Sequence, residues 1–240
     1  GGAVAARAGA ACKKSILELG GSDPFIVLED ADLTAAVAAA VRGRFANCGQ
    51  VCLAAKRFIV VDAVRQEFTA RFAASIAALR IGDPADRATQ LGPLARADLR
   101  SALDRQIQDS VRQGARLVTG GREIEGGGYY YAPTLLTHTT ASMQVVAEET
   151  FGPVAALMGA RDAEQALQMA NDSRYGLAAV IWTSDLERAR LLARRLEAGS
   201  VYINSVTASD PRLPVGGTKL SGYGRELGVA GIRAFVNLQS

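Results

Sequence analysis

The chain has 240 residues, of which 49% are hydrophobic and 21% charged, and its formal net charge at pH 7 is +3. Charges of both signs alternate along the expected helices, no apolar run could span a bilayer, and the three cysteines lack the Cys/His spacing of a zinc site. This composition excludes a disulfide-rich or disordered chain, and it predicts a globular protein of a reducing cytoplasm, with no nucleic-acid partner, no membrane contact and no metal.

The first half of the chain alternates expected helices with expected strands. An Ala-rich stretch and apolar residues recurring at helical spacing predict helices at 3–12, 33–45, 63–79 and 99–111. Apolar and β-branched runs predict strands at 15–19, 25–28 and 57–61. Asp30 or Asp32 can cap the second of these helices, because either carboxylate can accept a hydrogen bond from the free N–H groups of its first turn.

The second half continues the alternation until about Ser205, where a glycine- and proline-rich stretch begins. Strands are expected at 116–119, 129–136, 154–158, 177–183 and 200–204. Helices are expected at 162–170 and 185–197. Strands that alternate with helices of this length predict an α/β fold of three layers (αβα), in which helices cover both faces of a largely parallel sheet.

Two thiols, Cys48 and Cys52, lie on a predicted short turn between a helix and a strand. Gly49 allows the chain to bend sharply there, and free N–H groups at such a turn can lower the pKa of a thiol and bind an oxyanion. Glu18 ends an apolar strand, where a charge needs a reason. A thiol can attack a carbonyl carbon while a carboxylate accepts a proton from it or from water. Both cysteines could instead be buried hydrophobic residues that never meet Glu18, and the spacing alone does not decide.

Glu148 and Glu149 precede Phe151 and a Gly-Pro turn. Adjacent carboxylates can bind sugar hydroxyl groups while an aromatic ring packs beside a flat heterocycle. A solvated acidic turn before a strand fits the same residues.

The glycine-rich segment 214–226 lacks the flanking strand and the Gly-Lys-Ser/Thr order of a phosphate-binding loop. We therefore predict that it wraps around the sheet as a structural element. His138 is the only histidine and lies in a polar, Thr-rich stretch, so we expect it at the surface.

Five stretches, all in the same order along the chain, resemble motifs of the aldehyde dehydrogenase superfamily. They are residues 18–21 with Pro24, residues 45–52, residues 148–153, Asn171 with residues 175–177, and residues 214–226. Together they extend over nearly the whole chain, and Cys52 stands at the position of the family's nucleophile. The stretches 17–25 and 209–214 further resemble the succinate-semialdehyde dehydrogenase branch.

The resemblance implies a mechanism for the intact protein. Cys52 would attack the aldehyde to give a thiohemiacetal, and hydride would pass to the nicotinamide of NAD or NADP, leaving a thioester. Glu18 would then activate the water that releases the acid. The backbone N–H of Cys52 would help to bind the oxyanion.

The resemblance also implies contacts with the cofactor and the substrate. Glu149 would hold the nicotinamide ribose, and Phe151 would pack near the ring. Leu19 and Gly20 would approach the nicotinamide through their backbone. Ser209 would contact the distal carboxylate of the aldehyde substrate.

By the same resemblance, the chain is expected to be the catalytic portion of a longer enzyme. Residues 1–20 would be a remnant of the dinucleotide-binding domain, and residues 21–220 the catalytic domain. Residues 221–240 would return toward the cofactor or oligomerisation region. The full-length protein would form a homo-oligomer, and the isolated chain would turn over poorly because the pyrophosphate site would be missing.

Two other functions fit these residues. A folded scaffold or interaction fragment would leave Cys52 no more reactive than a free thiol. A residual thiol-esterase activity would use Cys52 and Glu18 and would require no dinucleotide. The preference for NAD or NADP, the particular aldehyde and the role of Cys48 stay open, and a disulfide between Cys48 and Cys52 would need demanding geometry.

Overall fold

The computed structural model describes residues 1–240. Its helices are α1 (Gly2–Ala10), α2 (Leu33–Phe45), the 3-10 turn η1 (Ala46–Gly49), α3 (Asp62–Ala77), α4 (Ala97–Arg112), α5 (Gln144–Ala147), α6 (Ala163–Asn171), α7 (Leu186–Ala193) and α8 (Gly228–Ala234). Its strands are β1 (Leu17–Glu18), β2 (Asp23–Val27), β3 (Ala55–Val61), β4 (Arg116–Thr119), β5 (Thr134–Thr137), β6 (Val154–Ala160), β7 (Tyr175–Gly176), β8 (Ala178–Trp182), β9 (Ser200–Ile203), β10 (Thr218–Lys219) and β11 (Gly222–Tyr223). None of the helices has both the length and the apolar character needed to cross a membrane.

Seven strands form the central sheet in the order β4-β5-β6-β3-β2-β8-β9. All neighbouring pairs from β5 to β9 are parallel, and only the edge strand β4 runs antiparallel to its neighbour β5. The predicted α/β fold with a largely parallel sheet is therefore confirmed.

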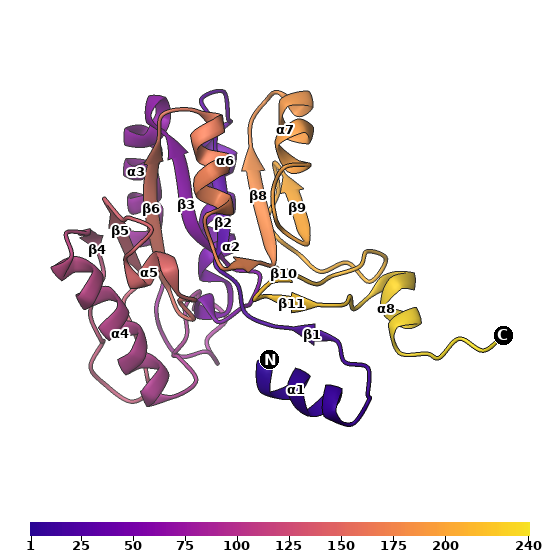
Figure 1. The fold of residues 1–240 in the computed structure, drawn as a ribbon. Helices are drawn as coiled ribbons and strands as arrows, with labels where there is room; N and C mark the ends of the chain where they lie inside the picture. The colour runs from indigo at the N-terminus through magenta and orange to yellow at the C-terminus, as the bar shows by residue number, and fades with distance from the viewer.

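Helices cover both faces of this sheet (Figure 1). α2 and α3 contact each other and pack on β3 and β6, whereas α6 packs across β2, β3 and β6, and α7 packs on β8 and β9. Crossovers between parallel strands are right-handed. The connection from β2 to β3 and the connection from β6 to β8 run in opposite directions across the sheet, so they pass over opposite faces. The result is the expected arrangement of three αβα layers.

The core between the layers is made of aliphatic and aromatic side chains. Every residue of β2 and β3 is buried, as expected for strands covered on both faces. The rings of Phe25 and Phe72 both pack on that of Phe58, with centroids 5.2 and 4.9 Å away. This packing holds β2, β3 and α3 together.

Two short antiparallel ribbons lie outside the central sheet: β1 pairs with β11, and β7 pairs with β10. The strand expected at 15–19 is therefore only two residues long and does not join the central sheet. The strand expected at 129–136 begins only at Thr134, because Pro133 has no N–H group to donate to a neighbouring strand. β10, β11 and α8 follow Ser205, where no regular element was predicted.

Candidate active site

The predicted site residues gather at the edge of the sheet where the parallel strands begin. Glu18 precedes β2, Cys52 precedes β3, and Glu149 precedes β6. Because β2, β3 and β6 are parallel neighbours, the segments that enter them arrive at the same edge. In Figure 1 this edge lies at the base of the sheet, beside β1, β10 and β11.

The turn that carries Cys52 is shaped by left-handed backbone and by a buried arginine. Cys48 and Gly49 have φ values of 57° and 71°, and a Cβ atom on Gly49 would lie only 2.3 Å from the Gly152 carbonyl oxygen. This position therefore requires glycine, as the sequence predicted. The guanidinium of Arg44 donates to the carbonyl oxygens of Gly49 at 2.7 Å and Gly152 at 2.8 Å. It thereby ties the thiol turn to the segment that enters β6.

The side chains of Cys52 and Glu18, which lie 34 positions apart in the sequence, meet in the fold. Burial and the nearby Glu226 raise the pKa of Glu18 above its ordinary value, and the adjacent Cys52 thiol offsets part of this rise. Glu18 Oε1 is buried and has no hydrogen-bond partner. A carboxylate in this environment is poised to accept a proton nearer to neutral pH than an exposed glutamate.

Burial, followed by the negative charge of Glu18, raises the pKa of the Cys52 thiol. The backbone N–H of Leu53 and the ammonium of Lys56 act in the opposite direction but do not outweigh them. The turn therefore supplies an N–H group that lowers the thiol pKa, but the removal of the sulfur from water outweighs it. The resting thiol is protonated at neutral pH and needs a neighbouring base to become a nucleophile.

Cys48 differs from Cys52 in its surroundings. It is buried in the hydrophobic core, and burial raises the pKa of its thiol to about 12. Cys48 and Cys52 are both free thiols in this structure. Of the two, Cys52 is the thiol that reaches the surface of the site.

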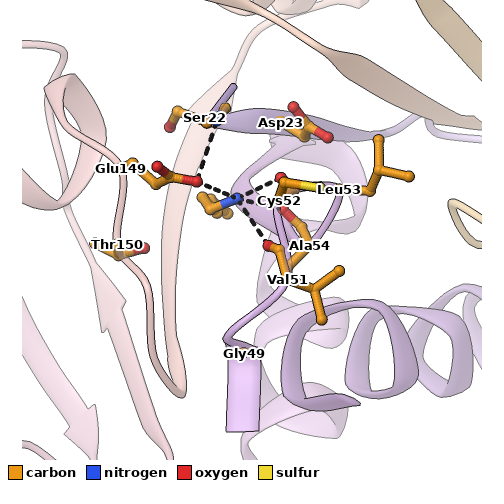
Figure 2. Close-up of polar contacts among 12 residues, drawn as sticks. Ser22, Asp23, Gly49, Val51, Cys52, Leu53, Ala54, Glu149 and Thr150 are labelled. Atoms are coloured by element: carbon orange, nitrogen blue, oxygen red, sulfur yellow. Dashed lines mark hydrogen bonds and ion pairs between the residues drawn. The ribbon is translucent and has the colours of Figure 1, made fainter. Parts of the chain in front are cut away.

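Glu149 faces the Cys52 loop, as Figure 2 shows. Its Oε1 accepts a hydrogen bond from the Gly21 N–H at 3.2 Å, and its side chain keeps 25% of its surface exposed. A Cβ atom on Gly20 would lie 2.0 Å from Glu149 Oε2, so the carboxylate lies directly against bare backbone. Glu148 instead turns toward α4, from which it accepts a hydrogen bond at 2.9 Å. Only the second of the two adjacent carboxylates therefore belongs to the site.

Two further predicted residues lie near Glu149. Phe151 follows it by two positions, and Leu19 precedes Gly20, whose backbone lies against the Glu149 carboxylate. Phe151 is 38% exposed, which leaves its ring available to a flat ligand. Leu19 is half-buried, and its N–H donates to the Ser221 carbonyl at 3.1 Å.

Ser209 is exposed on the loop that follows β9. Thr207, two residues earlier, donates from its hydroxyl to the Leu53 carbonyl at 2.7 Å, and Tyr202 donates to the Ala208 carbonyl at 2.8 Å. These bonds hold the loop against the residue that follows Cys52. The loop therefore brings Ser209 to the side of the molecule that carries the thiol.

The segment 214–226 wraps around the start of the sheet, as predicted. Ser221 is fully buried and donates to the Gly20 carbonyl at 2.7 Å, and it accepts from the Gly176 N–H at 3.1 Å. β11 in the same segment pairs with Glu18 and its neighbour. His138 is exposed and follows β5, at the opposite edge of the sheet, as expected for a surface residue.

Three buried charged residues at the start of β2 and β3 were missed from the sequence: Asp23 and Lys56, which act on the thiol, and Arg57, which faces α6. Burial raises the pKa of Asp23 to about 7 and lowers that of Lys56 to about 8. Two adjacent cations at the start of a strongly apolar strand were the available signal, because charged residues are rarely buried without a purpose.

The family model described as "Aldehyde dehydrogenase family" matches residues 1–240. The chain is 55% identical over 240 residues to the succinate semialdehyde dehydrogenase [NAD(P)+] Sad of Escherichia coli K12, covering 100% of this chain and 52% of that protein. It is 46% identical over 240 residues to the succinate-semialdehyde dehydrogenase [NADP(+)] 1 of Mycobacterium ulcerans, with the same coverage of 100% and 52%.

Among solved structures, Gox0499, described for its selection of cofactor and substrate, superposes with a TM-score of 0.97 and 47% identity. The superposition covers 99% of this chain and 52% of that one. The chain thus spans about half the length of the curated relatives it matches.

Proposed function

The chain belongs to the aldehyde dehydrogenase family, and on this basis we propose that it is the catalytic portion of an enzyme that oxidises succinate semialdehyde, or a related aldehyde, to the acid with NAD or NADP. The observation that carries the proposal is the meeting of the Cys52 thiol with the Glu18 carboxylate at the start of the sheet. The names of the relatives from E. coli and M. ulcerans support the choice of aldehyde.

In the proposed reaction, Cys52 is the nucleophile. Its thiol gives its proton to Glu18, and the sulfur forms a bond to the aldehyde carbon, which yields a thiohemiacetal. The N–H of Cys52 stabilises the oxygen that gains negative charge. Glu18 is suited to this proton transfer because its raised pKa makes the carboxylate a stronger base than that of an exposed glutamate.

Glu18 acts again when the acid is released. Glu18 first releases to solvent the proton that it took from the thiol. Once the adduct has lost a hydride it is a thioester, and the Glu18 carboxylate accepts a proton from the water that attacks it. The bond between carbon and sulfur then breaks, the acid leaves, and Cys52 recovers its proton. One carboxylate thus serves both halves of the cycle.

The residues beside Glu18 fit a nicotinamide dinucleotide. Glu149 offers a partly exposed carboxylate for ribose hydroxyl groups, Phe151 offers an exposed ring, and Leu19 and Gly20 present backbone. A bound nicotinamide would supply the hydride acceptor. We assign Ser209 to the distal carboxylate of the substrate, because its loop is bonded to the residue after Cys52.

The same proposal extends to the whole protein. Residues 1–20 are assigned to the dinucleotide-binding domain, 21–220 to the catalytic domain, and 221–240 to the region of cofactor or oligomer contacts. α1 has no buried residues, which fits a segment that packs on more of the protein. We place the full-length enzyme in the cytoplasm as a homo-oligomer.

Hydrolysis of p-nitrophenyl acetate by the purified 240-residue chain tests the central step without a dinucleotide. We expect nitrophenolate release that disappears in Cys52→Ala and persists in Cys12→Ala, whose exposed thiol is not among the groups that shift the pKa of Glu18. Equal hydrolysis by Cys52→Ala would contradict the assignment and favour a folded scaffold without catalysis. NAD(P)H formation from succinate semialdehyde by this chain should be poor, because it spans about half the length of its relatives. Rapid NAD(P)H formation by the chain would show that the cofactor needs no more than these residues.

A further inference from the structure

Lys56 is a fully buried lysine between the Cys52 loop and Glu149. Its Nζ donates to the carbonyl oxygens of Cys52 at 2.8 Å, Ala54 at 3.2 Å and Val51 at 3.4 Å. On its other side, Nζ lies 3.7 Å from Glu149 Oε1. Figure 2 shows Glu149 on one side of these contacts and the loop on the other. One ammonium group therefore touches the main chain of the nucleophile and the carboxylate assigned to the cofactor.

This arrangement uses all the bonding capacity of the side chain. An ammonium has three N–H donors and no acceptor, and here three carbonyl groups of one turn converge on it. A buried charge is costly unless it is paired, so the contacts and the charge depend on each other. A neutral apolar side chain at this position would leave the carbonyl groups of the turn without their shared donor.

The neighbouring Arg57 has a different role, which shows that the position of Lys56 is specific. Arg57 donates to the carbonyl oxygens of Ser22 at 2.7 Å, and of Met169 and Ala170 at 2.9 Å each. Because successive side chains of a strand point to opposite faces, Arg57 braces α6 while Lys56 faces the thiol turn. Burial alone therefore does not explain why a lysine occupies this side of β3.

The charge of Lys56 is set by groups on every element packed against it. Burial lowers its pKa to about 8, and Arg44 of α2 adds to this effect. Asp23 of β2, Glu149 and Cys52 act in the opposite direction. The ammonium in turn lowers the pKa of the Cys52 thiol, which Glu18 and Asp23 raise. Below about pH 8 the site therefore holds a positive charge close to the sulfur.

We propose that Lys56 is a positioning residue that fixes the Cys52 loop relative to Glu149 and places a positive charge beside the thiol. The part that concerns Glu149 rests on the proposed function, whereas the effect on the thiol does not depend on it. The ammonium lets one side chain hold the nucleophile in place and favour its thiolate form.

The test compares two neutral variants with a matched control. Lys56→Met removes both the charge and the donors, and Lys56→Gln removes the charge but keeps an amide donor. Lys219→Met is the control, because Lys219 also donates to two carbonyl groups, at 2.8 and 3.0 Å, and pairs with Glu197 at 2.6 Å. Lys219 is not among the groups that shift the pKa of Cys52, and its hydrogen bonds go to Asn171 and Ser173.

The readout is the rate of alkylation by iodoacetamide as a function of pH. Cys52 and the exposed Cys12 are followed separately by peptide mass spectrometry, so Cys12 is an internal reference in every sample. Thermal unfolding of each variant shows whether it is folded. Ester hydrolysis by the unchanged chain is measured in parallel, so a failure of the proposed function is seen independently.

We expect both Lys56 variants to alkylate Cys52 at least about threefold more slowly near pH 7, which corresponds to about half a pKa unit. The difference should shrink above about pH 8, where Lys56 itself loses its proton. Cys12 should react at the same rate in all samples, and Lys219→Met should match the unchanged chain. A pH-independent difference, or no difference, in a folded Lys56 variant would overturn the proposal. Failure of both neutral variants to fold would also overturn it, because Lys56 would then act through stability alone.

Discussion

Glu18→Gln is the sharpest test of the division of labour between the thiol and the carboxylate. The substitution keeps the shape of the side chain but removes its ability to accept a proton. Since Glu18 Oε1 is buried without a partner, the amide can occupy the site without breaking a hydrogen bond at that atom. A positioned general base contributes about 10²–10⁴ in rate, and the raised pKa of Glu18 makes it an effective one near neutral pH. We therefore expect release of the acyl group to slow by about 100-fold or more.

A burst assay with p-nitrophenyl acetate separates the two steps. At alkaline pH, where hydroxide can remove the thiol proton, Glu18→Gln should still release about one equivalent of nitrophenolate in a burst and then stall. In the unchanged chain the steady rate should rise with pH as Glu18 loses its proton, because only the carboxylate form is a base, and this rise should be absent in the variant. Glu148→Gln is the matched control, because that carboxylate faces α4. A steady rate and pH profile like those of the unchanged chain would refute the role of Glu18.

Three further predictions concern the residues that support the site. Arg44→Met should lower the free energy of unfolding by about 3 kcal/mol or more, because four backbone carbonyl groups lose a buried charged donor; urea unfolding measures this, with the exposed Arg71→Met as the control. Ser221→Ala should speed hydrogen exchange of the Gly176 amide by about tenfold, because that N–H loses its buried acceptor, and unchanged exchange would contradict this. Asp23 has its pKa raised to about 7 by burial, so the stability of the unchanged chain should fall as pH rises from about 4 to about 7. For Asp23→Asn, the free energy of unfolding measured in urea should not fall over the same pH range. If the two chains instead lost stability in parallel as pH rises, this role of Asp23 would be ruled out.

The elements whose residues interact locally were predictable from the sequence. The turn at Gly49 followed from a glycine between a helical pattern and a β-branched run, and β2 and β3 followed from continuous apolar residues. β1 was not predictable in its true extent, because only two of its residues pair, and their partners in β11 lie about 200 positions away. The direction of the Cys52 pKa shift was also out of reach. It depends on the balance between an N–H group, visible as a turn, and the loss of solvent, which only the packed fold reveals.

The candidate site lies at the edge of the sheet where the parallel strands begin. Open α/β sheets commonly bind ligands at the carboxyl ends of their strands, and that rule points to the edge opposite the candidate site. Here Glu18, Cys52 and Glu149 each stand shortly before a strand, and parallel neighbours all begin at one edge, so the three must converge there. The same geometry accounts for Lys56: as an early residue of β3 on the face of α2, it lies next to the turn that precedes its own strand and next to the one that precedes β6. A buried cation at the start of a parallel strand can therefore brace its own loop and a neighbouring one at once, a position that a cation at the strand's far end does not offer.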